Sequence, residues 1–429
     1  MKKMLERMKN SRFLVNTGWM MFAQIYQMLI SLIIGVITAR YLGPSNYGIL
    51  NYSASYISFF TIACQLGLEG IVVKEIINDR ENEGVILGSS IAMRLIAGAL
   101  SVVLVCVIIW IINPNDSLLL AVSFLQSLIL IFNAFNIIDC WYQSNLQSKT
   151  TTIFKCIAYT AMSIYKVVLL IFGKSVVWFA FSTSLDSLVI SILLLWHYRH
   201  NGKKQLKNNA GIGKRLFFQS YHLIISSLMA VIYSQMDKIM IGKIMDQTNV
   251  GFYSAATTIC HMWMFIPQAL SSSARPLIVD LKNRDEKIYL KRLKQLNFVT
   301  FWIGVGFATA ITVFSKFIIN VLYGSEYFAA REPLMLIVWS VAISALSYPN
   351  SIWMVCEGNQ RYNKYILIWG VFINLTLNAV GIPLLGMKGA AIATIATEFV
   401  CCFIAPLFYR RTRIYIKYLI ESIVGIGIK

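Results

Sequence analysis

The sequence predicts an all-α integral membrane protein with about twelve membrane-spanning helices. Of its 429 residues, 57% are hydrophobic and only 13% are charged, whereas about a quarter of the residues of a soluble protein are charged. Residues 13–39, 95–115 and 117–138 contain no Asp, Glu, Lys or Arg. Each of these stretches is longer than the ~20 residues with which a helix crosses the hydrocarbon core. Membrane β-barrels have short segments of alternating hydrophobicity instead, so helices are predicted.

Apolar runs separated by charged residues define the predicted spans. The first run is too long for the core of a signal peptide and no small-x-small cleavage site follows it, so it is predicted to be a retained span. The twelve predicted spans are 14–39, 47–67, 87–112, 118–139, 152–172, 176–197, 217–236, 252–274, 297–321, 334–355, 365–384 and 389–408.

The distribution of positive charge predicts the orientation of these spans. With the N-terminus inside, 28 of the 38 Lys and Arg residues lie on the cytoplasmic side, and seven lie in loops on the other side. This positive-inside bias predicts that both termini are cytoplasmic. The net charge of +19 then follows from topology and would meet anionic lipid headgroups. Nucleic acid is not an expected partner, because no segment outside the membrane is long enough for a basic binding domain.

A weak internal repeat predicts two halves. The segment YGILNYSAS (47–55) resembles VGFYSAATT (250–258) when Gly48 is aligned with Gly251, at an offset of 203 residues. Both halves start inside and contain six spans, so the repeat is predicted to be parallel, with a pseudo-two-fold axis along the membrane normal. The predicted parts are an N-terminal half (1–198), a basic cytoplasmic linker (199–215), a C-terminal half (216–408) and a cytoplasmic or interfacial tail (409–429).

Four segments resemble the polysaccharide-export branch of the MOP exporter superfamily and stand in the order found in that family. The resemblance covers essentially the whole chain and implies a MATE-like fold, although some relatives carry fourteen spans. In the first segment, Gly43 and Pro44 are expected to end a helix, and Gly48 lets the next one begin tightly. The segments are ARYLGPSNYG (39–48), LGLEGIVVKEI (66–76), DKIMIGK followed by VGFYSAA (237–256), and GIPLLGMKGAAIAT (381–394).

The resemblance implies a Wzx-type flippase of the bacterial inner membrane. Such a protein moves undecaprenyl-pyrophosphate-linked oligosaccharide repeat units to the outer leaflet for O-antigen or capsule synthesis. The two halves would rock around a central cavity, and H+ or Na+ is the expected coupling ion, with no other cofactor. The expected partners are the lipid-linked oligosaccharide, membrane lipids, and the polymerase and chain-length proteins of the same pathway.

Ionisable side chains inside spans are the candidate functional residues, because burying charge in a membrane is costly unless it faces a cavity or a partner. Cations would suit a pyrophosphate-bearing substrate, since the arginine fork binds phosphate bidentately. End-of-span cations could instead snorkel to headgroups, and Asp237 could be a structural cap. The substrate-cavity candidates are Arg40, Arg94, Lys166, Lys238 and Arg275; the coupling-ion or charge-partner candidates are Asp139, Asp186, Asp237 and Glu398.

Two prolines are predicted hinges. Pro267 and Pro349 remove backbone hydrogen bonds at membrane depth, as happens at transporter binding sites, although harmless kinks have the same signature. The eight cysteines and four histidines are scattered without ligand spacing, so neither a metal site nor a disulfide framework is predicted.

Two alternatives to a flippase remain open. A membrane-embedded O-antigen polymerase or ligase would need a large external loop with catalytic Arg or His residues. The longest predicted outer loop, 323–333, is short, and no catalytic grouping is evident, so no enzyme is predicted. A multidrug antiporter of the same fold would be expected to gather acidic residues around a cationic ligand. The intramembrane charge of this chain leans basic instead.

Overall fold

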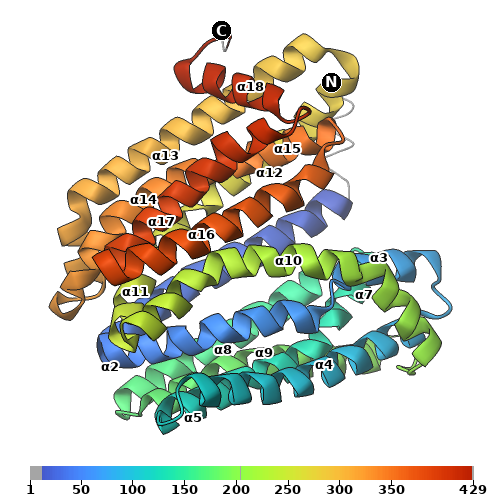
Figure 1. Ribbon diagram of the computed structural model, residues 1–429. Coiled ribbons are helices and arrows are strands. Elements are labelled where there is room, and N and C mark those ends of the chain that lie inside the picture. Colours follow the sequence, from blue (N-terminus) through green and yellow to red (C-terminus); the bar gives the residue numbers. More distant parts are fainter. Residues whose placement is uncertain (1–11, 203, 428–429) are drawn as a thin grey trace. The chain divides into compact units, whose positions relative to one another are not determined.

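The computed structural model describes residues 12–202 and 204–427, and every regular element in them is helical (Figure 1). The helices up to Asn201 are α2 (Arg12–Gln65), α3 (Glu69–Asn78), α4 (Glu83–Ile112), α5 (Ser117–Ser127), α6 (Ile129–Phe132), η1 (Asn133–Ile138), α7 (Asp139–Ser144), α8 (Ser148–Ile171) and α9 (Val176–Asn201). After these come α10 (Ala210–Ile244), α11 (Gln247–Trp263), α12 (Phe265–Arg284), α13 (Glu286–Leu322), η2 (Ser325–Ala330), α14 (Arg331–Ser344), α15 (Ser347–Cys356), η3 (Gln360–Tyr362), α16 (Asn363–Leu385), α17 (Met387–Phe399), η4 (Val400–Ile404), η5 (Ala405–Phe408) and α18 (Arg413–Val424).

The contacts divide the chain into two compact units. The first unit runs to Val231 but omits Gly43–Gly48, and the second consists of Gly43–Gly48 and the chain from Ile232 onward. The long helix α10 therefore begins in one unit and ends in the other. The predicted division into halves at the linker 199–215 stays a prediction.

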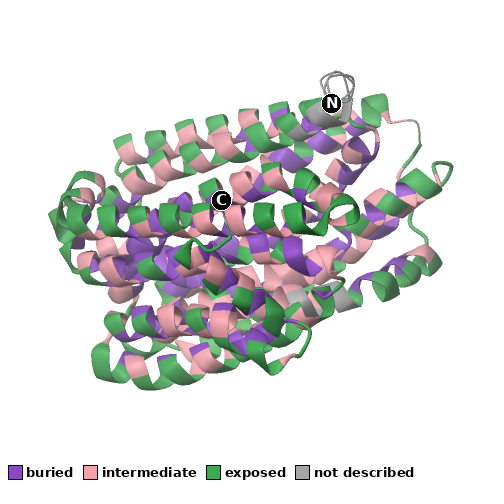
Figure 2. Cartoon of the chain, turned by 90° about the horizontal axis from the view of Figure 1, so that it is seen from above, coloured by how far each residue is buried: buried purple, intermediate pink, exposed green. Residues whose placement is uncertain are grey.

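The chain is a multi-pass membrane protein. Within residues 12–202 and 204–427, nine helices are long and apolar enough to cross a membrane. Exposed positions recur along the helices (green in Figure 2). Large apolar side chains occupy many of them, such as Ile96, Leu100 and Val103 on α4. The first of the nine, Gly18–Asn78, contains the second predicted span and all but the first four residues of the first one, 14–39. Predicted spans seven and eight fall on α10 and on α11 with α12, outside the nine, so the count of twelve and the side of the termini stay predictions.

Helix α2 changes direction at a glycine. Gly43 has φ 70° and ψ 172°, a conformation that essentially only glycine adopts without strain. Pro44 follows it directly and cannot continue the hydrogen-bond ladder of the preceding turn. The prediction that these two residues end a helix is confirmed.

Gly48 and Gly251 let two backbones touch in the second unit. A Cβ atom on Gly48 would lie 1.7 Å from the carbonyl oxygen of Gln247, and one on Gly251 would lie 2.0 Å from that of Pro44. Each of these carbonyls belongs to the residue four positions before the opposite glycine, so the contact is symmetric. No side chain fits at either position, and glycine allows helices to approach this closely.

Each unit has a buried core at one end of its helices. In the first unit Leu68, Trp141 and Tyr198 belong to this core. In the second unit α18 supplies Tyr415 and Leu419 to it, so the predicted interfacial tail contains a docked amphipathic helix. The Lys294 ammonium binds the Glu421 carboxylate of α18, and this hydrogen bond lowers the pKa of Glu421.

We expect Gly48→Ala and Gly251→Ala each to destabilise the protein by about 1–3 kcal/mol, because each added methyl overlaps a backbone carbonyl. Gly35→Ala is the matched control, since no atom outside its own helical backbone lies within 4 Å of a Cβ at that position of α2. The melting temperature of the purified protein in detergent, followed by size-exclusion chromatography, measures the effect. Equal melting temperatures for all three variants would contradict the importance of this contact.

Candidate functional site

A buried carboxylate is the centre of a polar cluster in the second unit. Asp237 on α10 is 7% exposed, and neutral donors bind both of its oxygens. Its Oδ1 accepts hydrogen bonds from the side-chain amides of Asn374 (3.1 Å) and Asn378 (2.6 Å). Its Oδ2 accepts from the hydroxyls of Tyr253 (2.7 Å) and Thr394 (2.6 Å). These bonds offset the cost of burying the charge in an apolar environment.

Four helices build this cluster, which we call the Asp237 cluster: Asp237 with Tyr253, Asn374, Asn378 and Thr394. Tyr253 lies on α11 and Thr394 on α17, while both asparagines lie on α16. Asn374 and Asn378 are one helical turn apart and share a face of α16. The hydrogen bonds of the Asp237 cluster therefore connect residues that are up to 157 positions apart in the chain.

Oxygen atoms predominate in the Asp237 cluster. Besides the carboxylate and the two hydroxyls, Asn378 contributes an Oδ1 that is buried without a hydrogen-bond partner. The carbonyl of Ala390 is also close and accepts a 3.0 Å hydrogen bond from Thr394. Hard cations prefer such oxygen ligands. A single carboxylate among neutral oxygens matches the charge of one proton or one Na+.

Sequence reasoning selected Asp237 but missed its four partners. Two asparagines at positions i and i+4 of an otherwise apolar span were the available signal. Within the described residues, no group of three or more His, Cys, Asp and Glu side chains could hold a metal ion.

Two other predicted residues lie on the same helices as the Asp237 cluster. Lys238 follows Asp237 on α10 and is half-buried. Among the ion pairs of the described residues, none joins Lys238 to Asp237. Glu398 on α17 lies beside the hydroxyl of Tyr233, which is on α10. Neither is a member of the hydrogen-bonded cluster.

Arg94 has structural partners in the first unit. Its side chain is 2% exposed, and its guanidinium donates a 3.0 Å hydrogen bond to the carbonyl of Gln65, the last residue of α2. The Glu69 carboxylate lies 3.6 Å away and is itself 65% exposed. The cavity beside Arg94 measures about 10 Å³, close to the size of one water molecule. In this conformation Arg94 caps a helix end, and its predicted contact with substrate stays a prediction.

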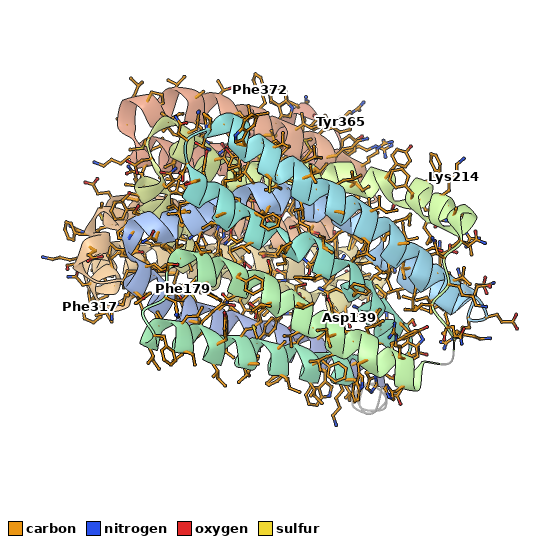
Figure 3. The ribbon with its side chains drawn as sticks, turned by 90° about the horizontal axis from the view of Figure 1, so that it is seen from below. Asp139, Phe179, Lys214, Phe317, Tyr365 and Phe372 are labelled. Carbon is orange, nitrogen blue, oxygen red and sulfur yellow. The ribbon has the colours of Figure 1, made fainter. Side chains whose placement is uncertain are left out.

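Three more of the predicted residues form ion pairs in the first unit. The Lys166 ammonium on α8 lies 3.3 Å from the Asp186 carboxylate on α9. Asp139 at the start of α7 pairs with Lys155 of α8 at 2.7 Å, a partner that sequence reasoning did not assign. Figure 3 shows Asp139 toward one end of this unit and Phe179 toward the other. Both pairs are partly exposed, and in this conformation Asp139 and Asp186 are charge partners, one of the two roles proposed for them from the sequence.

The remaining candidates are two exposed arginines and two prolines close to helix breaks. Arg40 on α2 and Arg275 on α12 are exposed. Pro267 and Pro349 each occupy the third position of a helix, α12 and α15, that restarts after a break within a predicted span. The first amides of a helix lack partners within it, so proline breaks no hydrogen bond there.

The two breaks also touch. The hydroxyl of Ser344, which ends α14, donates to the sulfur of Met264, which separates α11 from α12, at 3.7 Å. The hinge role of both prolines stays a prediction.

Comparison with known families identifies two matches. The family described as "Polysaccharide biosynthesis protein" matches residues 13–282, and the MatE family matches residues 223–380. The resemblance to the MOP superfamily is thereby confirmed.

Two curated relatives come from Haloferax volcanii. "Probable low-salt glycan biosynthesis flippase Agl15" is 26% identical over 212 residues, which are 48% of this chain and 43% of the relative. "Probable flippase AglR" is 27% identical over 183 residues, 40% of this chain and 37% of the relative. The chain thus matches less than half the length of either relative.

Solved structures share the fold. The lipid II flippase MurJ, in an inward closed conformation, matches with a TM-score of 0.70 at 14% identity, over 96% of this chain and 90% of that one. An inward-facing multidrug resistance MATE transporter of the MOP superfamily matches with a TM-score of 0.62 at 14% identity, over 92% of this chain and 96% of the other. The predicted all-α, MATE-like fold is confirmed.

We expect Arg94→Met to lower the stability of the protein by about 2 kcal/mol, because it removes a charged hydrogen bond from the end of α2. Glu69→Gln is expected to cost less than about 0.5 kcal/mol, because an exposed ion pair contributes little. Thermal melting of the detergent-purified variants measures both changes. A larger effect of Glu69→Gln than of Arg94→Met would show that the ion pair, rather than the helix cap, stabilises this end.

Proposed function

Because the chain belongs to the polysaccharide biosynthesis protein family, whose pattern spans residues 13–282, we propose that it is a flippase for lipid-linked glycans. The observation that carries this proposal is the family match, together with two curated relatives that are both named flippases. Flippases are transporters, so the names of both relatives agree with the prediction that the chain is not an enzyme.

The finer proposal concerns the cargo and its membrane. We propose undecaprenyl-pyrophosphate-linked oligosaccharide, carried across a bacterial inner membrane for O-antigen or capsule synthesis. The curated relatives are archaeal, so the lipid carrier is the part of this proposal that needs its own test. Multidrug export is the second candidate, because the MatE family matches residues 223–380.

Deleting the gene in its source organism distinguishes these functions. A lipid-linked oligosaccharide that accumulates on the cytoplasmic leaflet supports a flippase. Unpolymerised units on the outer leaflet would identify a polymerase, and normal surface polysaccharide with increased sensitivity to cationic drugs would identify a multidrug antiporter. Mass spectrometry of the accumulated lipid identifies its carrier and phosphate number.

We further propose that the Asp237 cluster binds the coupling ion, H+ or Na+. Its carboxylate is buried, it holds a single formal charge, and a buried amide oxygen beside it has no partner. Binding a cation would require the hydroxyl and amide donors to turn away from Asp237 and to present their oxygens instead. Because those donors lie on three helices other than α10, occupancy would change the packing of four helices together.

We expect Asp237→Asn to abolish the stimulation of transport by a Na+ or pH gradient in proteoliposomes, because the substitution keeps the shape but removes the charge. Na+ is also expected to raise the melting temperature of the wild type and not of Asp237→Asn, since a ligand at 100 times its Kd stabilises by about 2.7 kcal/mol. Protection by low pH without any effect of Na+ would assign the site to H+.

Asp186→Asn is the matched control for this experiment. It removes a carboxylate that already pairs with Lys166, so the dependence on the ion gradient is expected to persist. Unchanged ion dependence in Asp237→Asn would refute the coupling role while leaving the flippase proposal intact.

A further inference from the structure

An open cavity of about 840 Å³ lies in the first unit, apart from the Asp237 cluster. Its walls come from the loop between α3 and α4, from α7, from the start of α8, and from the end of α9 with the loop after it. The topology predicted from charge places these segments on the cytoplasmic side. The cavity therefore opens where soluble anions and lipid headgroups are both within reach.

Among the residues that the structure describes, three cations and one carboxylate line this cavity. The cations are Arg80, Lys149 and Lys204, and the carboxylate is Glu83. Among the described residues no ion pair neutralises any of these three cations, whereas Arg215 of the same unit pairs with a glutamate at 2.7 Å. Arg80 is held by a 2.9 Å hydrogen bond to the Asn145 side chain, a neutral acceptor that leaves its charge uncompensated.

The start of α8 adds positive potential to the same cavity. Gln147, Lys149 and Thr150 line the cavity, and they surround the first residues of this 24-residue helix. Gln147 makes no side-chain cap, and the first turn contains no acidic residue. The amide of Ser148, the first residue of the helix, donates a 2.7 Å hydrogen bond to the neutral Asn16 side chain. The amino end of a helix carries a partial positive charge that favours anions. The end of α9, which carries the opposite partial charge, also reaches the cavity, and Lys204 follows it in the chain.

Packed aromatic side chains form part of the cavity wall. Trp141 is 7% exposed and lines the cavity, and its rings pack edge-to-face on Tyr142 and Tyr198. Its indole Nε1 has no hydrogen-bond partner, and it is buried within the protein rather than exposed to the cavity. An unmade buried hydrogen bond costs stability, and the indole nitrogen can only donate. His197, also in the wall, is held by a 2.6 Å hydrogen bond to Tyr142.

We propose that this cavity, with Arg80, Lys149 and Lys204 as ligands, binds a phosphoryl group, of either an anionic lipid headgroup or a soluble phosphate. Three cations without an ion-pair partner, gathered in one cavity with a helix amino end that has no acidic residue, favour an anion with several acceptor oxygens. Arginine is suited to phosphate because its planar fork matches the geometry of phosphate oxygens. The site is separate from the Asp237 cluster and does not depend on the proposed transport function.

The soluble-ligand arm of the test uses inorganic pyrophosphate and the full chain in detergent, at constant ionic strength. We expect pyrophosphate to raise the melting temperature of the wild type. The double variant Arg80→Gln with Lys149→Gln is expected to weaken the apparent affinity by at least about tenfold, because it removes two charge-assisted hydrogen bonds. Lys204→Gln alone, a single change in an exposed loop, tests the same site if the double variant does not fold.

The lipid arm uses nanodiscs that contain phosphatidylglycerol or phosphatidylcholine, with native mass spectrometry of the lipid retained on the protein. Lys207→Gln is the matched control in both arms, because Lys207 is an exposed cation in the same loop as Lys204 but does not line the cavity. Loss of phosphatidylglycerol retention alone identifies a headgroup site, and loss of pyrophosphate binding alone identifies a soluble ligand. Equal behaviour of wild type, double variant and control toward both probes would overturn the proposal.

Discussion

The structure depends on one constraint: a hydrocarbon environment offers no hydrogen bonds, so a polar group within it is costly unless it finds a partner in the protein. Helices meet this demand for the backbone. Hydroxyl side chains on the spans find a partner within their own helix, the carbonyl four residues earlier. Ser90 donates to the carbonyl of Ile86, and Thr397 donates to that of Ala393. Charged side chains have no such local solution, and each of them therefore requires a group from another helix.

Arg94 and Asp237 answer this demand in different ways. The Arg94 guanidinium donates a hydrogen bond to a backbone carbonyl at the end of α2, where the last carbonyls of a helix have no partner within it. Asp237 is surrounded by neutral donors that can rotate and present oxygens instead. The first arrangement fixes a helix end and leaves only a water-sized space beside it. The second contains one buried carboxylate among neutral oxygen atoms, and for this reason we propose the coupling-ion site there.

The sequence was sufficient to predict the membrane class, the helical fold and the turn at Gly43, because each depends on local composition or on the conformation of one residue. It did not predict where spans would break. The interruptions near Met264 and Leu346 depend on packing between helices, and each proline follows its break rather than marking the midpoint.

The partners of the buried charges were the other part that remained hidden. Asn378 and Thr394 reach Asp237 from positions 141 and 157 residues away. Lys155 likewise reaches Asp139 from a different helix. Spacing along one helix cannot reveal such pairs, so the sequence could indicate which charges needed partners but not which residues would supply them.

The crossing at Gly48 and Gly251 has a further consequence. Each glycine faces the carbonyl of the residue four positions before the other glycine. The two segments therefore make equivalent contacts with each other. This is the isologous geometry of a homodimer at its two-fold axis, where one patch meets a second copy of itself. At this crossing a single polypeptide makes a contact of the kind that two identical subunits make at a two-fold axis. A substitution of Gly48 therefore has a structural counterpart at Gly251.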